Sequence, residues 1–304
     1  MISISSHMST LFGGDLHAGI AGIELQESTF SLGHGLTLSK TYAHLMAPFL
    51  MAFKPAPRGQ HHPAPWKPAL GGSSFDIDAE LFIPADIERT FGSRFEVATT
   101  VLFLLRLGVN PAITLPVFAN YAFNELANVK DGAALLYPYE VQSRHFPLGV
   151  DGGLATSDSI SWTAERWPVA QKMINESAEF ALAVYAIDGG QFLRQSALTL
   201  VSLWAAIEAL FSPSTSELTF RVSSLVATFL EPPGAARHDL QRSVAKLYAK
   251  RSAAAHGKPK HEPEDLLATF NLLRRILMAI IDRGSVPSKE ELEQLLFGVS
   301  TIDA

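Results

Sequence analysis

Apolar residues recur at three- and four-residue spacing through most of the second half of the chain, from Ala164 onward. This spacing places them on one face of a helix, and such a stripe is typical of a helix that packs against others. The clearest stripe lies in residues 192–211 and consists of Leu193, Ala197, Leu200, Val201, Trp204, Ile207 and Phe211. Further stripes follow it, separated by short loops. The pattern therefore predicts an all-α, antiparallel helical bundle over residues 160–304.

Capping signals indicate where several of these helices begin. Ser214 and Glu217 form a capping-box pattern, in which the serine accepts a backbone N–H bond and the glutamate reaches back. Pro263 suits the first position of a later helix, because the N–H that proline lacks would have no partner there. Ser288 and Glu291 repeat the capping pattern before a short last helix.

The first half of the chain carries mixed signals that predict an α+β fold. Residues 23–40 alternate apolar and polar side chains around the Gly-His-Gly sequence at 33–35, which predicts a β-hairpin. Residues 75–83 alternate in the same way and predict a strand, whereas the apolar segment 94–107 predicts a buried helix. Residues 55–72 hold five prolines and three glycines and predict an exposed loop.

Two segments of small residues separate the mixed pattern from the helical one. Residues 149–153 are rich in glycine and residues 156–161 are rich in serine, as is typical of linkers between domains. We therefore expect an α+β domain at residues 1–155 and a helical domain at residues 160–304. The first domain would serve in sensing or substrate positioning, and an activating ligand or partner would bind there.

The composition excludes several classes of protein. The apolar run Val101–Val109 is interrupted by Arg106, and no run reaches the roughly 18 to 20 residues that cross a bilayer. The first ten residues lack the basic and apolar segments of a secretion signal, so we expect a cytoplasmic protein without a membrane partner. Because the chain has no cysteine, a thiolate nucleophile and a cysteine zinc site are excluded.

Basic residues gather in one part of the helical half. The net charge of −6 argues against a protein that coats long stretches of nucleic acid. Arg237–Lys260, however, contains seven basic residues and one acidic residue, Asp239. Within it, Arg242, Lys246 and Lys250 recur every four residues and share one helix face. This basic stripe is either a solvated surface or a track for RNA phosphates.

The basic stripe leads directly to Arg251 and His256, our candidates for a phosphate-handling site. Arginine can hold a phosphate with two parallel hydrogen bonds, and histidine can take and return a proton near neutral pH. Five residues apart on a straight helix, the two side chains would diverge by about 140°. They converge only where the helix bends or ends, and Gly257 with Pro259 predicts that it ends there.

The sequence around this pair has further features that belong together. They are the segment LWAAIEALF at 203–211, Arg221, the segment LYAKRS at 247–252, and His256 followed by Gly257. With these features, residues 190–300 resemble the HEPN superfamily, and specifically its Apea-like branch. The signature of that family, an arginine followed a few residues later by a histidine, is met at Arg251 and His256.

The resemblance implies a function. Many HEPN proteins are metal-independent endoribonucleases of bacterial defence and toxin systems, and two subunits pair so that both motifs line one cleft. It implies that Arg251 and His256 are catalytic in a homodimer that needs no cofactor. A ribose 2′-hydroxyl would attack the adjacent phosphate of the RNA, leaving a 2′,3′-cyclic phosphate. Ser252, a supporting residue, stands where many members have Asn, Asp or His. Some HEPN proteins bind RNA or nucleotides without cleaving them. The alternative is therefore a non-catalytic module for RNA or nucleotide binding or for dimerisation.

Two neighbours of this pair allow two interpretations each. Glu208 lies at the edge of a buried stripe, where a carboxylate is costly without a partner. It either pairs with Arg221 or Arg251 or acts directly in catalysis. Tyr248 is either a core residue or a source of a hydroxyl group at the site.

Other candidate sites are weaker. His61 and His62, taken with Asp76 and Asp78, contain residue types that bind metals. Adjacent histidines in a proline-rich loop are poor geometry for a common metal, so we expect no metal site. The sequence has no Gly-x-Ser-x-Gly elbow, and it therefore gives no support to an α/β-hydrolase.

Overall fold

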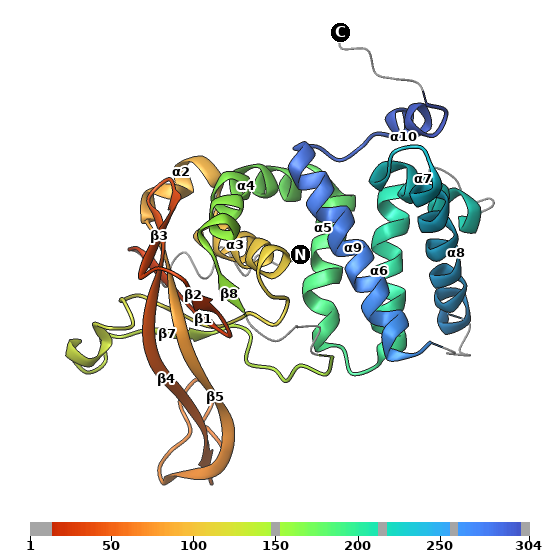
Figure 1. The fold of residues 1–304 in the computed structure, drawn as a ribbon. Coiled ribbons are helices and arrows are strands. Elements are labelled where there is room, and N and C mark those ends of the chain that lie inside the picture. Colours follow the sequence, from red (N-terminus) through yellow and green to blue (C-terminus); the bar gives the residue numbers. More distant parts are fainter. Residues whose placement is uncertain (1–13, 147–152, 212–217, 256–260, 299–304) are drawn as a thin grey trace.

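The computed structural model describes residues 14–146, 153–211, 218–255 and 261–298. Its N-terminal part contains a curled antiparallel sheet packed on helix α3, and its C-terminal part is helical (Figure 1). The expected order of an α+β part followed by a helical part is confirmed. The strands are β1 (Leu16–Ala21), β2 (Glu24–Leu25), β3 (Thr29–Gly33), β4 (Leu36–Ala52), β5 (Trp66–Ile83), β6 (Thr114–Ala119), β7 (Leu136–Pro138) and β8 (Leu154–Ala155).

The helices of the described ranges divide between the two parts. The α-helices are α2 (Glu88–Phe91), α3 (Arg94–Gly108), α4 (Ser157–Glu176), α5 (Ala178–Gly189), α6 (Ser196–Phe211), α7 (Leu218–Leu230), α8 (Ala235–Ala255), α9 (Pro263–Arg283) and α10 (Lys289–Leu296). Short 3-10 helices lie at η1 (Ala85–Ile87), η2 (Leu126–Asn128) and η3 (Gly190–Phe192). Within the ranges described, no helix has both the length and the apolar character needed to cross a membrane.

Six strands form an antiparallel sheet in the order β3-β4-β5-β1-β6-β7, and β2 pairs separately with β8 in parallel. The predicted hairpin is confirmed as the β3–β4 connection. Gly33, His34 and Gly35 all have positive φ there, a conformation that glycine adopts without steric cost. The predicted strand at 75–83 is the end of the longer strand β5.

The prediction of a loop over residues 55–72 is wrong in its last part. Trp66–Gly72 belongs to β5, which pairs with β4 as far as Trp66 opposite Ala52. The glycines of this segment suit the close approach of β4 and β5. Gly72 has φ +104, and a Cβ on it would lie 2.0 Å from the Ala47 carbonyl oxygen. Pro68 lies opposite Leu50 of β4, in a part of β5 that has no second neighbouring strand, and proline is found in strands mainly at such edges.

Helix α3 confirms the predicted buried helix at 94–107. The Ser93 side chain caps it by accepting a hydrogen bond from the Phe95 backbone N–H. It lies against the sheet on one side and against α4 on the other, so that side chains on nearly all of its faces are buried. Such all-round burial explains why its sequence is apolar throughout rather than striped.

Helix α4 begins earlier than the sequence suggested. The serine-rich segment 156–161 is not a linker: Thr156 caps the helix by accepting a hydrogen bond from the Ser159 backbone N–H, and the residues after it form the first turn. The predicted starts at Pro263 and at Ser288 with Glu291 are confirmed. The predicted capping box at residues 214–217 lies outside the described residues.

The two halves of the chain share one hydrophobic core. Apolar side chains from the sheet, α3 and the helices of the second half form a continuous buried cluster. The indole N–H of the buried Trp167 on α4 donates to the Leu32 carbonyl at 2.8 Å, and the Arg274 guanidinium on α9 donates to the Leu107 carbonyl at 2.7 Å. Independent folding of residues 1–155 and 160–304 stays a prediction. Separating the two halves would expose the apolar side chains of this shared core to water.

Candidate functional site

The structure brings Arg251, Glu208 and Tyr248 together at the C-terminal end of α8. Arg251 Nη2 donates to Glu208 Oε2 at 2.9 Å, which joins α8 to α6. The guanidinium also lies over the Tyr248 ring, 5.6 Å from its centre. Of the two partners predicted for Glu208, Arg251 is therefore the one that forms the ion pair.

The surroundings hold this ion pair in place. Tyr248 is buried, and its ring meets that of Trp204 edge to face, with centres 5.1 Å apart. Burial, together with a hydrogen bond to Glu208, raises the pKa of Tyr248 to about 12, so its hydroxyl keeps its proton. The ring of Tyr248 thus packs in the core, which confirms the first of its two predicted roles; a role of its hydroxyl at the site stays a prediction.

The ion pair retains polar atoms that are not satisfied. The Arg251 and Glu208 side chains are 23% and 19% exposed, so the pair is reached from solvent. Arg251 Nε and Glu208 Oε1 are buried, and neither has a hydrogen-bond partner in the part of the chain that the structure describes. Arg221, on the neighbouring helix α7, also has a buried Nε of this kind. A site that a ligand completes would leave donors and acceptors open in this way.

His256 and Gly257, the second half of the predicted motif, lie outside the described residues. Helix α8 is described as far as Ala255, the residue immediately before His256 in the sequence. Ser252 is partly buried on the same last turn as Arg251. Of the predicted pair, the structure therefore describes Arg251 and its neighbours, and His256 stays a prediction.

The basic stripe divides into two kinds of residue. Arg242 and Lys246 are exposed, and neither forms an ion pair with any described residue. Lys250 lies 3.2 Å from Asp265 of α9. A backbone hydrogen bond from Glu262 lowers the pKa of Asp265, and Lys250 lowers it further, so Asp265 is charged at neutral pH. Two of the three predicted phosphate contacts are thus open to a ligand.

Sequence reasoning missed a second polar cluster, built around Arg106. This side chain is 4% exposed, and it donates to Glu140 at 2.7 Å and to the Ile113 carbonyl at 2.9 Å. A second carboxylate, Asp188 of α5, lies 3.2 Å away. Burial lowers the pKa of Arg106, but these two carboxylates more than offset it, so the guanidinium stays charged. The signal in the sequence was a single arginine inside an apolar run.

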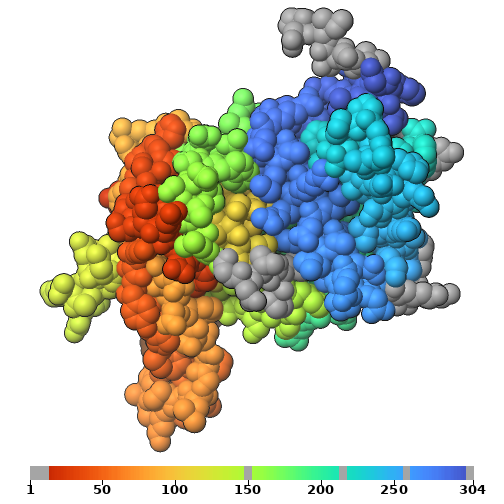
Figure 2. Space-filling view, in the orientation of Figure 1, coloured from red at the N-terminus to blue at the C-terminus, as the bar shows by residue number. Residues whose placement is uncertain are grey.

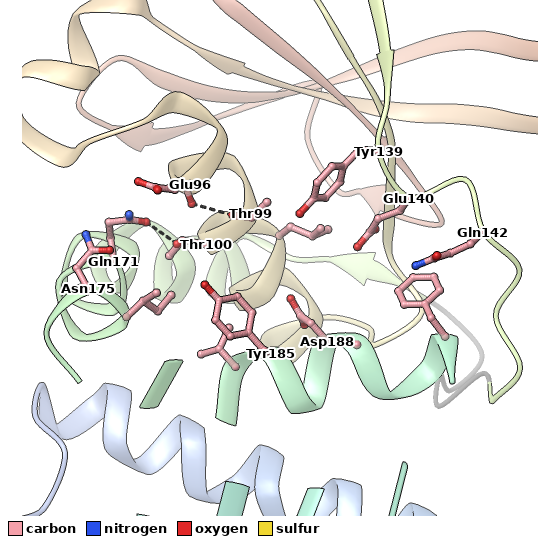
Figure 3. A pocket seen from close by; sticks show the side chains of 15 residues that line it. Glu96, Thr99, Thr100, Tyr139, Glu140, Gln142, Gln171, Asn175, Tyr185 and Asp188 are labelled. Atoms are coloured by element: carbon pink, nitrogen blue, oxygen red, sulfur yellow. Dashed lines mark hydrogen bonds between the residues drawn. The ribbon is translucent and has the colours of Figure 1, made fainter. Parts of the chain in front are cut away.

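Above this cluster lies a cavity of about 380 Å³, called the Asp188 cavity below (Figure 3). Helices α3, α4 and α5 and the segment after β7 form its walls, and the carboxylates of Glu140 and Asp188 face the same space. Its polar lining consists of Glu96, Thr99, Thr100, Tyr139, Glu140, Gln142, Gln171, Asn175, Tyr185 and Asp188. The volume is within the range of small-molecule sites.

Burial changes the ionisation of two groups in this cavity. It raises the pKa of Asp188 to about 6; Arg106 opposes that shift and Glu140 adds to it. Burial also raises the pKa of Tyr139 to about 12, and the charges of Glu140 and Asp188 contribute. Asp188 therefore changes its charge close to neutral pH, whereas Tyr139 stays neutral.

The residues of the weaker metal candidate separate in the fold. His62 is exposed beside the Lys54 carbonyl at 2.9 Å, Asp76 contacts His44 at 2.8 Å, and Asp78 accepts the Gly22 backbone N–H at 2.7 Å. Across the described ranges, no group of three or more His, Cys, Asp or Glu side chains could hold a metal ion.

No family model matches the chain, and no match to it was found among curated proteins or solved structures. Its function must therefore be argued from its own residues and geometry. Two features carry that argument: the Arg251 ion pair at the end of α8 and the Asp188 cavity.

Proposed function

We propose that the chain is a metal-independent endoribonuclease of the HEPN type, with Arg251 and His256 as its catalytic pair. The observation that carries the proposal is the state of Arg251. Glu208 and Tyr248 hold its guanidinium at the end of α8, it is partly exposed, and one of its N–H groups has no described partner. A fixed, incompletely bonded guanidinium is suited to binding a phosphate, because little freedom remains to be lost.

In the proposed reaction, the RNA supplies its own nucleophile. The 2′-oxygen forms a bond to the adjacent phosphorus while the bond from phosphorus to the 5′-oxygen breaks. His256 takes the proton from the 2′-hydroxyl, and a proton is returned to the leaving 5′-oxygen. Arg251 stabilises the charge that builds on the phosphoryl oxygens. The products are a 2′,3′-cyclic phosphate and a 5′-hydroxyl, and DNA does not react.

The other residues have distinct roles in this proposal. Glu208 is a positioning residue, which fixes the guanidinium and does not contact the phosphate. Arg242 and Lys246 bind RNA phosphates along α8 and lead the strand to the site. Lys250 contributes less, because Asp265 already neutralises it. The protein would act as a cytoplasmic homodimer in a bacterial defence or toxin-type system.

One observation favours the alternative of a non-catalytic module that binds RNA or nucleotides or serves dimerisation. Glu208 already neutralises Arg251, and a neutral pair attracts a phosphate less strongly than a free cation does. In that case the ion pair would chiefly join α6 to α8. The two functions differ in what happens to bound RNA, and a cleavage assay separates them.

The experiment measures cleavage of single-stranded RNA by the full chain in EDTA. His256→Ala should lower the cleavage rate by about a hundredfold or more, because the proton relay is lost. The matched control is His238→Ala, since His238 is exposed on the same helix. Full cleavage by a well-folded His256→Ala protein contradicts the mechanism. RNA that stays intact with the wild-type chain, both alone and with an activating partner, favours the alternative.

Arg251 needs a second variant, because its loss also leaves Glu208 without an ion-pair partner. Arg251→Ala should abolish cleavage but also lower thermal stability. Adding Glu208→Gln removes the uncompensated carboxylate, so the double variant should recover stability without recovering cleavage. Recovery of cleavage in the double variant would mean that Arg251 is structural and not catalytic.

Reversing the charges of Arg242 and Lys246 tests the proposed RNA track. The double variant should bind RNA more weakly, and its affinity should depend less steeply on salt, because fewer counterions are released. Lys250 is left unchanged, so that its ion pair with Asp265 stays intact. An unchanged salt dependence would identify the stripe as a solvated surface.

A further inference from the structure

Strands β4 and β5 continue beyond the sheet as a two-stranded arm. β1 pairs with β5 only at Ala79–Ile83, whereas β4 and β5 pair with each other as far as Ala52 and Trp66. The resulting β-arm, residues 42–76, projects from the body of the molecule (Figures 1 and 2). At about 3.3 Å per residue, its paired part is roughly 30 Å long.

Large apolar side chains cover the β-arm and are exposed. They are Tyr42, Met46, Phe49, Leu50, Met51, Phe53, Trp66 and Leu70. Successive residues of a strand point to opposite faces, and the neighbours Phe49 and Leu50 are 62% and 61% exposed. Both faces of the ribbon are therefore apolar, and exposed apolar patches of this size mark interaction surfaces.

An apolar ribbon of this kind is not suited to a lipid bilayer. A membrane surface would cover one face, and insertion of the whole arm would place the open strand edges in hydrocarbon, where backbone groups have no partner. Insertion would also carry the tip, with Lys54 and Arg58, across the apolar layer. A polypeptide surface can enclose both faces and still leave the tip in a polar environment.

The area and the charge of the β-arm fit a second copy of this chain. With about 200 Å² per large side chain and the exposed fractions above, each arm offers roughly 1,000 Å² of apolar surface, and two arms roughly 2,000 Å², which permanent dimers reach. The arm holds three of the 24 basic and one of the 30 acidic residues. Its net charge is therefore +2, and that of the rest of the chain is −8.

This charge distribution decides how two copies would meet. Two arms packed on each other would bring positive charges together, whereas an arm on the body of the other copy meets negative charge. Addition of strands edge to edge is hindered, because Pro48 and Pro68 have no N–H to donate. The arm of one copy must then be bound through its side chains by the body of the other.

The Asp188 cavity has the properties that the cationic tip requires. Two of the three carboxylates that line it, Glu140 and Asp188, already form ion pairs with Arg106. Glu96, the third carboxylate, forms no ion pair with any residue of the described ranges. Tyr139 and Tyr185, both exposed in part, offer ring faces to a cation.

We propose that the chain forms a dimer by reciprocal arm exchange, in which the β-arm of each copy packs on the body of the other and Arg58 enters the Asp188 cavity beside Glu96. The exposed apolar side chains of the arm supply the buried area, and Arg58 with Glu96 fixes where the tip lies. This dimer does not depend on the ribonuclease activity proposed above, and a chain that cuts no RNA would still form it.

The first experiment measures the mass of the full chain in solution by sedimentation equilibrium. The wild-type chain should be a dimer at micromolar concentration. Phe49→Ser with Leu50→Ser should weaken dimerisation by at least tenfold without lowering the melting temperature, because both side chains lie outside the core. The matched control is Phe220→Ser on α7, whose side chain is 63% exposed and which should leave the dimer intact. A monomeric wild-type chain overturns the proposal.

The second experiment tests the position of the tip by charge exchange. Arg58→Glu should weaken the dimer, and so should Glu96→Arg, whereas the two changes together should restore it at least in part. Failure of the pair to restore dimerisation overturns the assignment of the tip to the Asp188 cavity. Binding of a monomeric chain to phosphatidylglycerol vesicles or to single-stranded RNA, lost in the Phe49 and Leu50 variant, would overturn the second copy as the occupant of the arm.

Discussion

The protonation of Asp188 should make the stability of this protein depend on pH in a direction opposite to that of an ordinary salt-bridged aspartate. Its pKa is raised to about 6 from an ordinary 3.8, because burial disfavours its charge more than Arg106 favours it. The folded chain therefore keeps this proton to a higher pH than the unfolded chain. Between these two pKa values the folded state binds more protons, so Asp188 lowers the free energy of unfolding as pH rises.

The size of this effect follows from the difference in pKa. Two pKa units correspond to about 3 kcal/mol at about 1.4 kcal/mol per unit, and about 2 kcal/mol of this falls between pH 4.5 and pH 8. The Asp188 side chain is 22% exposed, so solvent screening makes these upper values. Asp188→Asn cannot ionise, and it leaves Arg106 its bonds to Glu140 and to the Ile113 carbonyl.

The assay is urea unfolding of the wild-type chain and of Asp188→Asn at several pH values. Between pH 4.5 and pH 8, the free energy of unfolding of the variant should rise by about 2 kcal/mol relative to that of the wild type. Most of this change should occur below pH 6. Asp131→Asn, an exposed change in a described loop, supplies the control for a general loss of charge. A difference in unfolding free energy between variant and wild type that stays constant with pH would refute the reasoning. So would a wild type that gains stability relative to the variant as pH rises, because burial would then not outweigh Arg106 at Asp188.

Two further predictions concern the core that the two halves share. Trp167→Phe removes the bond from the indole N–H to the Leu32 carbonyl and should lower the free energy of unfolding by about 1 to 2 kcal/mol. Trp162→Phe removes a hydrogen bond to the exposed Asp282 and should lower the free energy of unfolding by less. Equal losses of stability in the two variants would contradict the importance of the buried bond. A fragment of residues 160–304 should be helical by circular dichroism but less stable than the full chain, because the buried face of α4 becomes exposed. A melting temperature equal to that of the full chain would show instead that the helical half folds independently.

Much of the helical half was predictable because the signals for it are local. Apolar stripes and capping residues act within a few turns. The structure confirms the helix predicted at 192–211, although it begins at Ser196, and also the helix start at Pro263 and the cap at Ser288. The hairpin at residues 33–35 was predictable for the same reason, since two glycines there allow positive φ. Each of these features can be decided from neighbours in the sequence.

The β-arm and the start of α4 were missed because their local signals have two meanings. Prolines and glycines in residues 66–72 are typical of a loop, but pairing with β4 across the sequence outweighs that preference. Thr156 and the serines after it resemble a flexible linker, yet the same hydroxyls cap a helix when one follows. Long-range packing decides between the two meanings in both cases.

The candidate site was predictable only in part. Glu208 had two plausible partners, because the spacing along a helix gives the face of a residue but not which neighbouring helix faces it. The structure assigns it to Arg251. Arg106 was visible as a charge inside an apolar run, but its partners Glu140 and Asp188 lie on elements whose approach no local pattern encodes.

The packing of α5 relates the two polar sites to each other. Its residues Tyr185 and Asp188 line the cavity, and the same helix packs against α6, which carries Glu208. An arm or ligand that fills the cavity therefore contacts a helix whose neighbour orients Arg251. A displacement of α5 that repacks its contact with α6 would shift Glu208 and so change the Glu208–Arg251 ion pair. Through this contact the N-terminal half could act on the proposed site without reaching it.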